Sequence, residues 1–586
     1  MPNTIPEYIS SPLSIIAKLF DEYVQDPAVQ PSEFDPSSHF KSLFPNDNER
    51  KKIPTINNVT VEQLPKNTLV RFRCMVQDPQ MGQELFVAAY KRPSDGRIVS
   101  TSYTEDLRNT EAGEFDVDDV ENHYLGERTM VYCVSPPGET IWAKRKLYHQ
   151  DINDVMQQLT IQENGENDFK SPLSNKFPLP NTKHTSAAIK FYGLSQESVK
   201  VGQLIEVIGV LSHPQNQDIT TAATEASSST VSTGVDEYSL PTTSYADVPV
   251  IHAITHRILE RADSAPFSSL ERRDVSAQAY DIREKLIGYI SSAFGGDNLV
   301  AEYVLLLLLS RVTGKASGLK IGQFALNVVN FPVTQSDTSL SDNKNNKLKP
   351  KNVASKLVFE LLGNLVHHCV GIPLSIELLN HTRFMPKSEN ENLEAGLLQL
   401  TDGTMVILDE TAMTEGTLGD LGVRNVQVIQ DLVTQQSLTY VFPYSNYVFD
   451  TDYSILCLSE GKSILPNDCV IPLQSTFTTE ELPQLDEQLL ELFRLYIQSM
   501  KFNDYGIDSK VSDDITESFV RERKAAQQNK TKLPTQEDLM RWMSMARLIA
   551  LSYGEEKLTK ELYDHARNMD SERTHRLLGG DEEARK

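Results

Sequence analysis

Hydrophobic and polar residues alternate along two stretches of the chain, residues 51–150 and 181–214, as they do in half-buried β-strands. The run "TLVRFRCMVQD" is followed by "QELFVAAYKR", "RTMVYCVSPPGETIWAKR", "SAAIKFYG" and "QLIEVIGVLS". The residues expected on the apolar face of the first run are Val70, Phe72, Cys74 and Val76. We predict that these runs form one β-barrel of the OB type, whose two parts are separated by a polar linker at residues 151–180.

A different spacing predicts helices on both sides of this β-rich part. In "SPLSIIAKLFDEYV", within an N-terminal helical segment at residues 1–50, apolar residues recur at helical intervals. Such a helix either packs on its own domain or docks on a partner. A low-complexity insertion rich in Thr, Ser and Ala occupies residues 215–248, and a helical region is expected at residues 249–318. This region contains "DNLVAEYVLLLLLSRV", predicted to be a buried helix with Asp297 or Asn298 as its N-cap.

Strands and helices alternate over residues 319–477, which predicts a parallel sheet with right-handed crossovers. The expected strands are "GQFALNVVNF", "PLSIELLN", "TMVILDE" and "YSILCLS", and a hairpin made of "LTYVFPY" and "NYVFDTD" precedes the last of them. Residues 478–586 are predicted to be helical and to end in a charged tail. The expected fold class is therefore α+β and multidomain: an OB-like β-barrel followed by a degenerate AAA+-like α/β module with a helical C-terminal lid.

The charge balance argues against direct nucleic-acid binding. The net charge is −25 and the pI is about 5.0, so a polyanion would be repelled. Residues 105–121 alone carry eight acidic residues and one arginine. Three aromatic residues of the predicted barrel, Phe72, Tyr132 and Trp142, either stack on the bases of a single strand or pack in the core. We favour a protein-interaction or structural barrel, and an OB-type single-strand binder is the alternative.

Cysteine and histidine usage indicates no metal site. The five cysteines include no C-x-x-C pair, so neither a zinc site nor a disulfide framework is expected, and a reducing compartment is indicated. The pairs His252/His256 and His367/His368 lack a third ligand nearby, and we expect these histidines at the surface or at helix ends. The N-terminal residues do not resemble a signal peptide, and the most apolar run, "YVLLLLLSRV", is too short to span a bilayer. No membrane partner is expected.

The candidate chemistry lies in "GTMVILDETAMTEGTL", where a buried-strand pattern runs into Asp409 and Glu410. This is how a Walker B motif appears: the Asp binds Mg²⁺ and the neighbouring Glu orients water. A P-loop also needs a glycine-rich turn, and residues 332–352 contain no glycine. The Gly-Lys pairs at residues 314–315 and 461–462 stand at the wrong places, and Ser459 and Glu460 follow the last strand where AAA+ ATPases have an Asn.

We therefore interpret Asp409 and Glu410 as a vestigial Walker B-like pair and assign no catalytic, cofactor-binding or metal-binding residue. The chain is expected not to be an enzyme. A nucleotide hydrolase with an unorthodox phosphate loop is the alternative, and these two acids are its only support.

Several long segments resemble one family. They are "SPLSIIAKLF", "LVRFRCMVQD", "VYCVSPPGETIWAK", "FPLPNTKHTSAAIKFYG", "GDNLVAEYVLLLLLSRV", "LLQLTDGTMVILDETAMTEGTL" and "YSILCLSEGKSILPNDCVIPLQ". Together, and in this order, they resemble the mini-chromosome maintenance (MCM) complex-binding protein family. The resemblance implies a nuclear replication factor that binds subunits of the MCM helicase and is associated with chromatin through them. It further implies roles in disassembling or unloading MCM complexes, in protecting MCM subunits and in sister-chromatid cohesion.

The resemblance also suggests how such a chain would act. A barrel followed by an AAA+-like module is the layout of an MCM subunit, so the chain could compete for a subunit's place without hydrolysing ATP. The segment "EDLMRWMSMARLIALSYGEEKLTKELYDHARNMD" looks like the lid of such a module. Within it, Arg547 either stands where a lid arginine would reach nucleotide or is an ordinary packing arginine. No function is transferred to the insertion at residues 215–248 or to the loop at residues 332–352.

Overall fold

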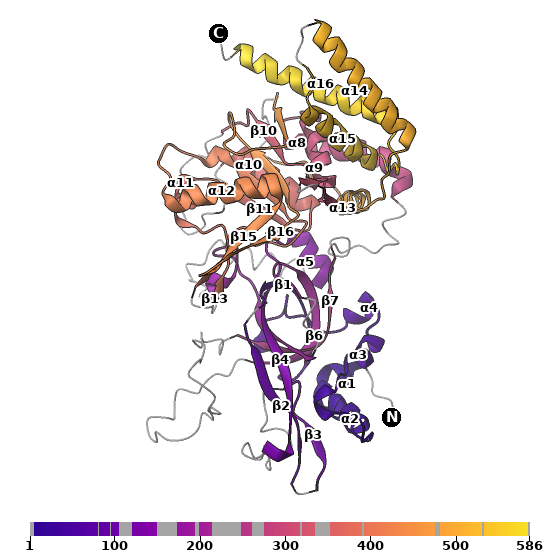
Figure 1. Cartoon of the computed structure of the whole chain (residues 1–586), viewed down its shortest axis with the longest axis vertical. Helices are drawn as coiled ribbons and strands as arrows, with labels where there is room; N and C mark the ends of the chain where they lie inside the picture. Colours follow the sequence, from indigo (N-terminus) through magenta and orange to yellow (C-terminus); the bar gives the residue numbers. More distant parts are fainter. Residues whose placement is uncertain are drawn as a thin grey trace.

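The computed structural model describes residues 5–79, 81–93, 95–104, 120–148, 173–193, 199–213, 248–260, 275–316, 319–333, 348, 352–389, 392–474, 481–529 and 533–583. Most of the predicted linker, of the insertion, of the acidic loop and of the Lys-rich loop lies outside these ranges, but residues 173–180 at the end of the linker are described. The N-terminal helices lie beside a β-barrel, an α/β module sits at one end of that barrel, and the C-terminal helices cover the module (Figure 1). The chain is mixed α and β with several separate sheets.

The barrel forms because one sheet closes on itself. Its strand order is β1-β6-β7-β5-β4, with β2 and β3 continuing beyond β4, and a further pairing of β1 with β4 completes the ring. Its interior holds the apolar face predicted for the first run, including Val70, Phe72, Cys74 and Val76. The strands are β1 (Leu69–Asp78), β2 (Gln83–Lys91), β3 (Ile98–Ser100), β4 (His123–Val134), β5 (Ser186–Tyr192), β6 (Leu204–Ser212) and β7 (Val250–Ile258).

Strand β7 corrects the predicted helical region at residues 249–318, because its residues are the last strand of the barrel. It pairs antiparallel with β6 and parallel with β5. A register irregularity opposite Ile208 and Gly209 interrupts the alternation along β7, and a bulge of this kind shifts the apolar residues out of a period of two. The spacing of Ile251, Ile254 and Ile258 consequently imitates a helix.

The N-terminal helices pack on the outside of the barrel. They are α1 (Ile5–Ser10), α2 (Pro12–Tyr23), α3 (Ser37–Leu43) and α4 (Asp47–Arg50). Ile15 and Ile16 of α2 share one hydrophobic cluster with Leu69 and Val210 of the barrel. The apolar face of α2 is thus used within the chain, which favours packing on its own domain over docking on a partner.

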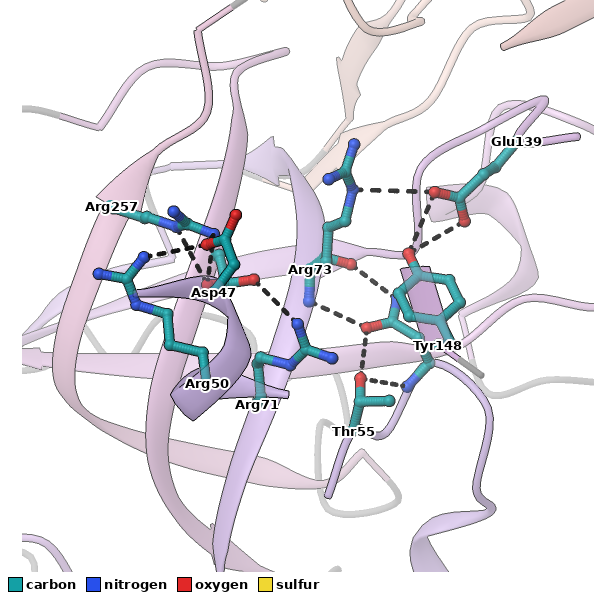
Figure 2. A network of polar contacts seen from close by, with 10 residues as sticks. Asp47, Arg50, Thr55, Arg71, Arg73, Glu139, Tyr148 and Arg257 are labelled. Atoms are coloured by element: carbon teal, nitrogen blue, oxygen red, sulfur yellow. Dashed lines mark hydrogen bonds and ion pairs between the residues drawn. The ribbon is translucent and has the colours of Figure 1, made fainter. Parts of the chain in front are cut away.

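Charged side chains on β1 and β7 form a network that is buried around β1 and open to solvent at Asp47 (Figure 2). Arg71 pairs with Glu206, and Arg257 bridges Glu206 to Asp47 of helix α4. On the same strand, Arg73 pairs with Glu139, whose carboxylate also accepts a hydrogen bond from the Tyr148 hydroxyl. The charged residues Arg71 and Arg73 of β1 can be buried because each is paired with a carboxylate, which offsets the cost of removing a charge from water.

The α/β module contains the predicted parallel sheet, in the order β11-β14-β17-β10-β18. Met405 and Ile407 of β14 face one hydrophobic cluster, whereas Val406 and Leu408 face another, so both faces of the sheet are covered. Buried apolar runs of this kind are typical of parallel strands. The strands are β10 (Leu326–Val329), β11 (Cys369–Pro373), β14 (Met405–Asp409), β17 (Ser454–Leu458) and β18 (Cys469–Pro472).

Two short sheets accompany this module. A four-stranded sheet has the order β13-β12-β15-β16, and β8 pairs with β9. The expected hairpin is confirmed as the antiparallel pair β15–β16. The strands are β8 (Gly314–Ala316), β9 (Leu319–Ile321), β12 (Lys387–Glu389), β13 (Asn392–Glu394), β15 (Ser437–Val441) and β16 (Asn446–Asp450).

Helices surround the sheet, and α9 is the predicted buried helix, capped by the Asp297 side chain. The helices are α8 (Ala279–Ser292), α9 (Asn298–Leu309), α10 (Val353–Leu365), α11 (Ile376–His381), α12 (Asp420–Gln435), α13 (Glu487–Lys501), α14 (Ser509–Asn529), α15 (Gln536–Ser552) and α16 (Lys560–Glu583). Among the described residues, none of the helices combines the length and the hydrophobicity that crossing a membrane requires.

Two local predictions were wrong. The run "PLSIELLN" was expected to be a strand, but the strand β11 precedes it and the run itself enters helix α11, which Ser375 caps by accepting from the Leu378 N–H. Trp142 was placed in a strand and lies instead in helix α5 (Ile141–Tyr148). In both cases a short apolar run was ambiguous between the two periods.

The barrel and the α/β module are joined by buried hydrogen bonds. The Trp142 indole N–H donates to the carbonyls of Gly363 and Val366, and the Gly138 carbonyl accepts from the Cys369 N–H. With Phe72 and Tyr132 also buried, none of the three aromatic residues considered for base stacking is available at the surface. The single-strand binder therefore loses the side chains on which it depended.

Candidate functional site

The candidate site is the edge of the parallel sheet where the strands end at their carboxyl termini. Strand β14 lies between β11 and β17, and Asp409 is its last residue. In α/β sheets of this kind, this edge is where ligands bind. The two acids found in the sequence are thus at the position where an ATPase would use them.

Asp409 is buried, and one of its carboxylate oxygens accepts hydrogen bonds from a neighbouring residue of the chain. Its Oδ1 accepts from the Thr411 backbone N–H at 3.0 Å and from the Thr411 hydroxyl at 2.6 Å. These bonds cap a single 3₁₀ turn at Glu410–Ala412. A side chain used as a cap in this way satisfies backbone donors that would otherwise be left unpaired.

Glu410 turns toward the loop that follows β17. Its Oε1 accepts from the Ser463 hydroxyl at 2.6 Å. Burial raises the pKa of this carboxyl above its usual value of 4.5, and the Asp409 charge adds to the rise, whereas hydrogen bonds from Ser463 and the Ile464 backbone oppose it. The protein therefore disfavours the ionised form of Glu410 relative to water.

This shift predicts a pH-dependent effect of Glu410→Gln. The pKa of Glu410 is higher in the folded than in the unfolded chain, where it is 4.5. Protonated Glu410 therefore stabilises the fold at pH values below 4.5, and this contribution is lost as the pH rises through the pKa of the folded state. Glutamine does not titrate and still accepts from Ser463, so near neutral pH the variant should match or exceed the wild type, within about 1 kcal/mol. Urea denaturation at about pH 5 and about pH 7.5 measures this, and a stability difference that does not move toward the variant at the higher pH contradicts it.

The N-terminus of helix α10, where a P-loop protein would bind phosphate, is closed by Asn352. Its side-chain oxygen accepts from the Ala354 N–H at 3.1 Å. Its amide group donates to the Pro332 carbonyl at 2.7 Å and to the Thr411 hydroxyl at 3.1 Å. One side chain thus caps the helix, links the two ends of the β10–α10 connection and touches the residue bound to Asp409. One of the helix amides that would hold phosphate, that of Ala354, thus already has an internal acceptor.

Behind this cap is a small cavity of about 10 Å³, lined by Ser355, Asp409 and apolar neighbours. The Ser355 hydroxyl and Asp409 Oδ2 are both buried without a protein hydrogen-bond partner. A Ser and an Asp at these places would hold Mg²⁺ in a P-loop ATPase. The volume accommodates about one water molecule, whereas protein-bound Mg²⁺ needs an octahedron of oxygens and usually keeps several waters.

These residues do not fit a nucleotide. The connection after β10 has no glycine for a phosphate-binding turn, the helix end is capped by Asn352, and Glu410 is bound to Ser463. At the end of β17, the Ser459 hydroxyl donates to Asn327 of β10 at 3.1 Å and is likewise engaged within the sheet. Among the residues that the structure describes at this edge, the arrangement holds loops together and leaves no positioned donors for a phosphate.

Arg547 is not brought to this edge. It lies on α15 beside Gly322, and burial, followed by the nearby Arg311 charge, lowers the pKa of its guanidinium group. Gly322 precedes the start of β10, so Arg547 is near the amino-terminal ends of the strands, whereas Asp409 is at their carboxyl ends. The structure thus places Arg547 away from this edge, on a helix that packs against α9 in the hydrophobic core.

Two of the four histidines, His252 and His368, are not at the surface, whereas His256 and His367 are half-buried. His252 and His368 are fully buried, and burial lowers the pKa of both well below the usual value. His252 lies in the barrel, where its Nδ1 is hydrogen-bonded to the Tyr192 hydroxyl. Within the described part of the chain, no three His, Cys, Asp or Glu side chains are grouped as metal ligands.

Sequence reasoning missed three residues of this edge: Asn352, Ser355 and Ser463. A signal existed for the first, because an Asn directly before an apolar-periodic run is a typical helix N-cap. Nothing local marked the other two. Ser355 faces Asp409 across the sheet edge, and Ser463 meets Glu410 only because two loops come together.

Comparison with known proteins gives one consistent result. The family model described as "Mini-chromosome maintenance replisome factor" matches residues 40–168 and 150–577. A Gallus gallus protein named "Mini-chromosome maintenance complex-binding protein" is 26% identical over 652 residues, covering 98% of each chain. A protein of the same name from Arabidopsis thaliana is 28% identical, and the match covers 92% of each chain. Another from Homo sapiens is 25% identical, and the match covers 97% of this chain and 98% of the human one.

Proposed function

Because the chain belongs to the mini-chromosome maintenance (MCM) complex-binding protein family, we propose that it binds subunits of the MCM helicase as a non-enzymatic partner in DNA replication. The observation that carries this proposal is the family match, which extends over residues 40–577. The likeness therefore concerns the whole arrangement of barrel, module and helices, and not one shared domain.

The strand orders of the two modules support binding by mimicry, if the barrel and the parallel sheet are assigned to the two folds of an MCM subunit. The barrel is a ring of β1, β4, β5, β7 and β6 with one parallel pair, β5–β7, and we assign it to the OB type. In the parallel sheet, the first strand β10 lies between β17 and β18, an order typical of AAA+ modules, and we assign the module to that class. Both assignments are part of the proposal.

The closed phosphate-binding edge explains how such a protein would act without ATP. Asn352 caps the helix that would bind phosphate, and Glu410 is bound to Ser463. A module of this kind would present an ATPase-like shape to a neighbouring subunit while supplying no hydrolysis. The buried hydrogen bonds between barrel and module keep that shape rigid.

The cellular roles that we propose follow from the same binding to MCM subunits. A chain that takes the place of one subunit would open a ring, which is how disassembly and unloading from chromatin would follow. The same contact on a free subunit would protect it before assembly. We place the protein in the nucleus, where its partners act, and connect sister-chromatid cohesion with the same binding.

Co-purification tests the proposal. The tagged chain isolated from a nuclear extract should carry MCM subunits stably, and their absence would overturn it. Two further experiments separate disassembly from protection. Purified chain added to preformed MCM complexes should release subunits if it disassembles them. Purified chain added to isolated MCM subunits should slow their aggregation or degradation if it protects them. Cross-linking with a mixture of subunits identifies the one in contact.

A double variant tests whether the two acids take part in binding. Asp409→Asn with Glu410→Gln keeps size and most hydrogen-bond acceptors but removes both charges. We expect MCM binding to stay nearly intact and the free energy of unfolding to fall by about 1 to 3 kcal/mol, mainly because Asp409 loses its charge-assisted bonds to Thr411. Affinity and thermal melting are measured on the same preparation. Loss of MCM binding in a fully folded variant would mean that the acids form a working site.

A further inference from the structure

The hairpin β15–β16 exposes a group of large apolar side chains. Tyr444 at its tip is 100% exposed, and Val448 and Tyr447 on β16 are 64% and 56% exposed. Phe449 is the fourth large apolar residue exposed there. The hairpin lies at the end of the α/β module that faces the barrel, and neither body covers it (Figure 1).

The aromatic residues of the hairpin gather on one face. Tyr440 contacts Phe449 with ring centroids 4.7 Å apart, and Phe442 contacts Tyr447 with centroids 5.5 Å apart. Both contacts are edge-to-face, a favourable geometry for aromatic pairs. Tyr440 is buried and anchors this row to the module core, so the exposed rings are held in place before any partner arrives.

Strand β16 is also an open edge. It is the last strand of its sheet and, within the residues that the structure describes, pairs only with β15. Proteins usually protect such edges with lysines, prolines or bulges. The strand "NYVFD" contains no lysine or proline, and its pairing with β15 is regular. An unprotected edge with exposed apolar side chains on both faces is suited to the addition of another strand.

The size of this patch matches a contact with another protein. From their exposed fractions, Tyr444, Tyr447, Val448 and Phe449 together offer roughly 400 to 500 Å² of surface, distributed over the tip and both faces of the hairpin. The largest apolar patch on a typical monomer is about 300 to 600 Å² and is often functional, and a standard interface takes about 800 Å² from each partner. The hairpin can thus supply the central part of a modest interface.

The charge of the protein indicates which kind of molecule the exposed hairpin binds. A nucleic acid strand and a second copy of this chain would both meet a net charge of −25. The exposed Asp450 at the end of β16 adds an acidic group beside the patch, although Lys320 pairs with it. A protein segment that is neutral or basic meets no such repulsion. Tyrosine and phenylalanine are also among the residues enriched at protein interfaces.

We infer that β16 binds an extended, non-acidic segment of an MCM subunit by strand addition, with Tyr444, Tyr447, Val448 and Phe449 packing against its side chains. This inference rests on the proposed function and names the surface through which it operates. The backbone of β16 would provide the hydrogen bonds, and the aromatic row would select apolar residues at alternate positions of the incoming strand.

The test places lysines on the strand edge. In Tyr447→Lys with Val448→Lys, both substituted side chains are largely exposed, so the fold should be kept and the melting temperature should fall only slightly, because the Phe442–Tyr447 ring contact is lost. Affinity for purified MCM subunits, measured with the full-length chain, should fall at least about tenfold because the apolar contact is lost and the edge is protected. On binding to the wild type, the amides of β16 should exchange more slowly with solvent.

A matched control uses another exposed apolar pair. Leu85 and Leu125, on β2 and β4, are 73% and 55% exposed, and Leu85→Lys with Leu125→Lys should bind MCM subunits like the wild type. Equal losses in both variants, or no loss in the β16 variant, overturn the inference while the proposed function stands. A wild type that binds no MCM subunit overturns the proposed function itself. If the β16 variant instead loses a single-stranded oligonucleotide or a self-associated dimer, the occupant is wrong and the inference fails.

Discussion

Replacing Lys176 with methionine is expected to lower the free energy of unfolding by about 3 to 5 kcal/mol, because the buried carboxylate of Asp78 loses its ion pair with Lys176. Lys176 is 1% exposed. Its ammonium group donates to Asp78 Oδ2 at 2.8 Å and to the Leu393 carbonyl at 3.2 Å. Asp78 ends strand β1 of the barrel, whereas Leu393 belongs to β13 of the α/β module. One lysine therefore connects the two bodies.

Denaturation by urea, followed by circular dichroism and by tryptophan fluorescence, measures this loss. Trp142 lies at the same junction and reports on its opening. Lys52→Met is the matched control, because Lys52 pairs with Glu49 at the surface and such pairs contribute at most about 1 kcal/mol. Adding Asp78→Leu to the Lys176 variant should recover part of the loss, since no unpaired charge then remains. A Lys176 variant as stable as the control would contradict the argument.

Ile407→Ala should cost about 2 to 5 kcal/mol, because it opens a cavity in the middle of the parallel sheet. Ile407 is buried on β14, which has a strand on each side, and it faces the hydrophobic cluster that includes α9 and α10. The surrounding elements cannot collapse easily into the space, since neighbouring strands hold their positions by hydrogen bonds. Binding to MCM subunits should weaken in proportion to the unfolded fraction.

The control for this variant is Ile507→Ala, where the same atoms are removed from an exposed side chain. Its effect should stay within about 0.5 kcal/mol. Thermal melts and MCM affinity are measured for both variants at a temperature where the wild type is folded. An Ile407 variant that remains folded but has lost its affinity would show that this strand carries an interface and not only the core.

Most elements of the parallel sheet could be predicted because each one carries a local signal. Strand β14 is a short apolar run between turn residues, and α9 is an apolar run directly after Asp297, which caps it. The prediction missed strand β7 for an equally local reason, since a bulge opposite Gly209 interrupts the alternation of apolar and polar residues along it. The run that enters α11 failed because Ser375 caps a helix where an apolar segment alone suggested a strand.

The candidate site was only half predictable. Asp409 and Glu410 follow a recognisable strand, so the sequence locates them at a sheet edge. Their partners, Thr411 and Ser463, depend on how the following loops turn back. The position of Arg547 depended on which face of the sheet α15 covers, and helix pattern alone does not contain that information.

By itself, the sequence determined the family resemblance, the two-module order, the absence of glycine from the loop at residues 332–352 and the acidic charge. These are properties of residue types and local spacing. Only the tertiary structure decided that β7 closes the barrel across an insertion, that Lys176 joins the two bodies, and that the aromatic face of β15–β16 stays exposed. The physical reason is that a local pattern records how strongly a segment prefers burial, whereas which distant segment covers it, or fails to, depends on the packing of the whole chain.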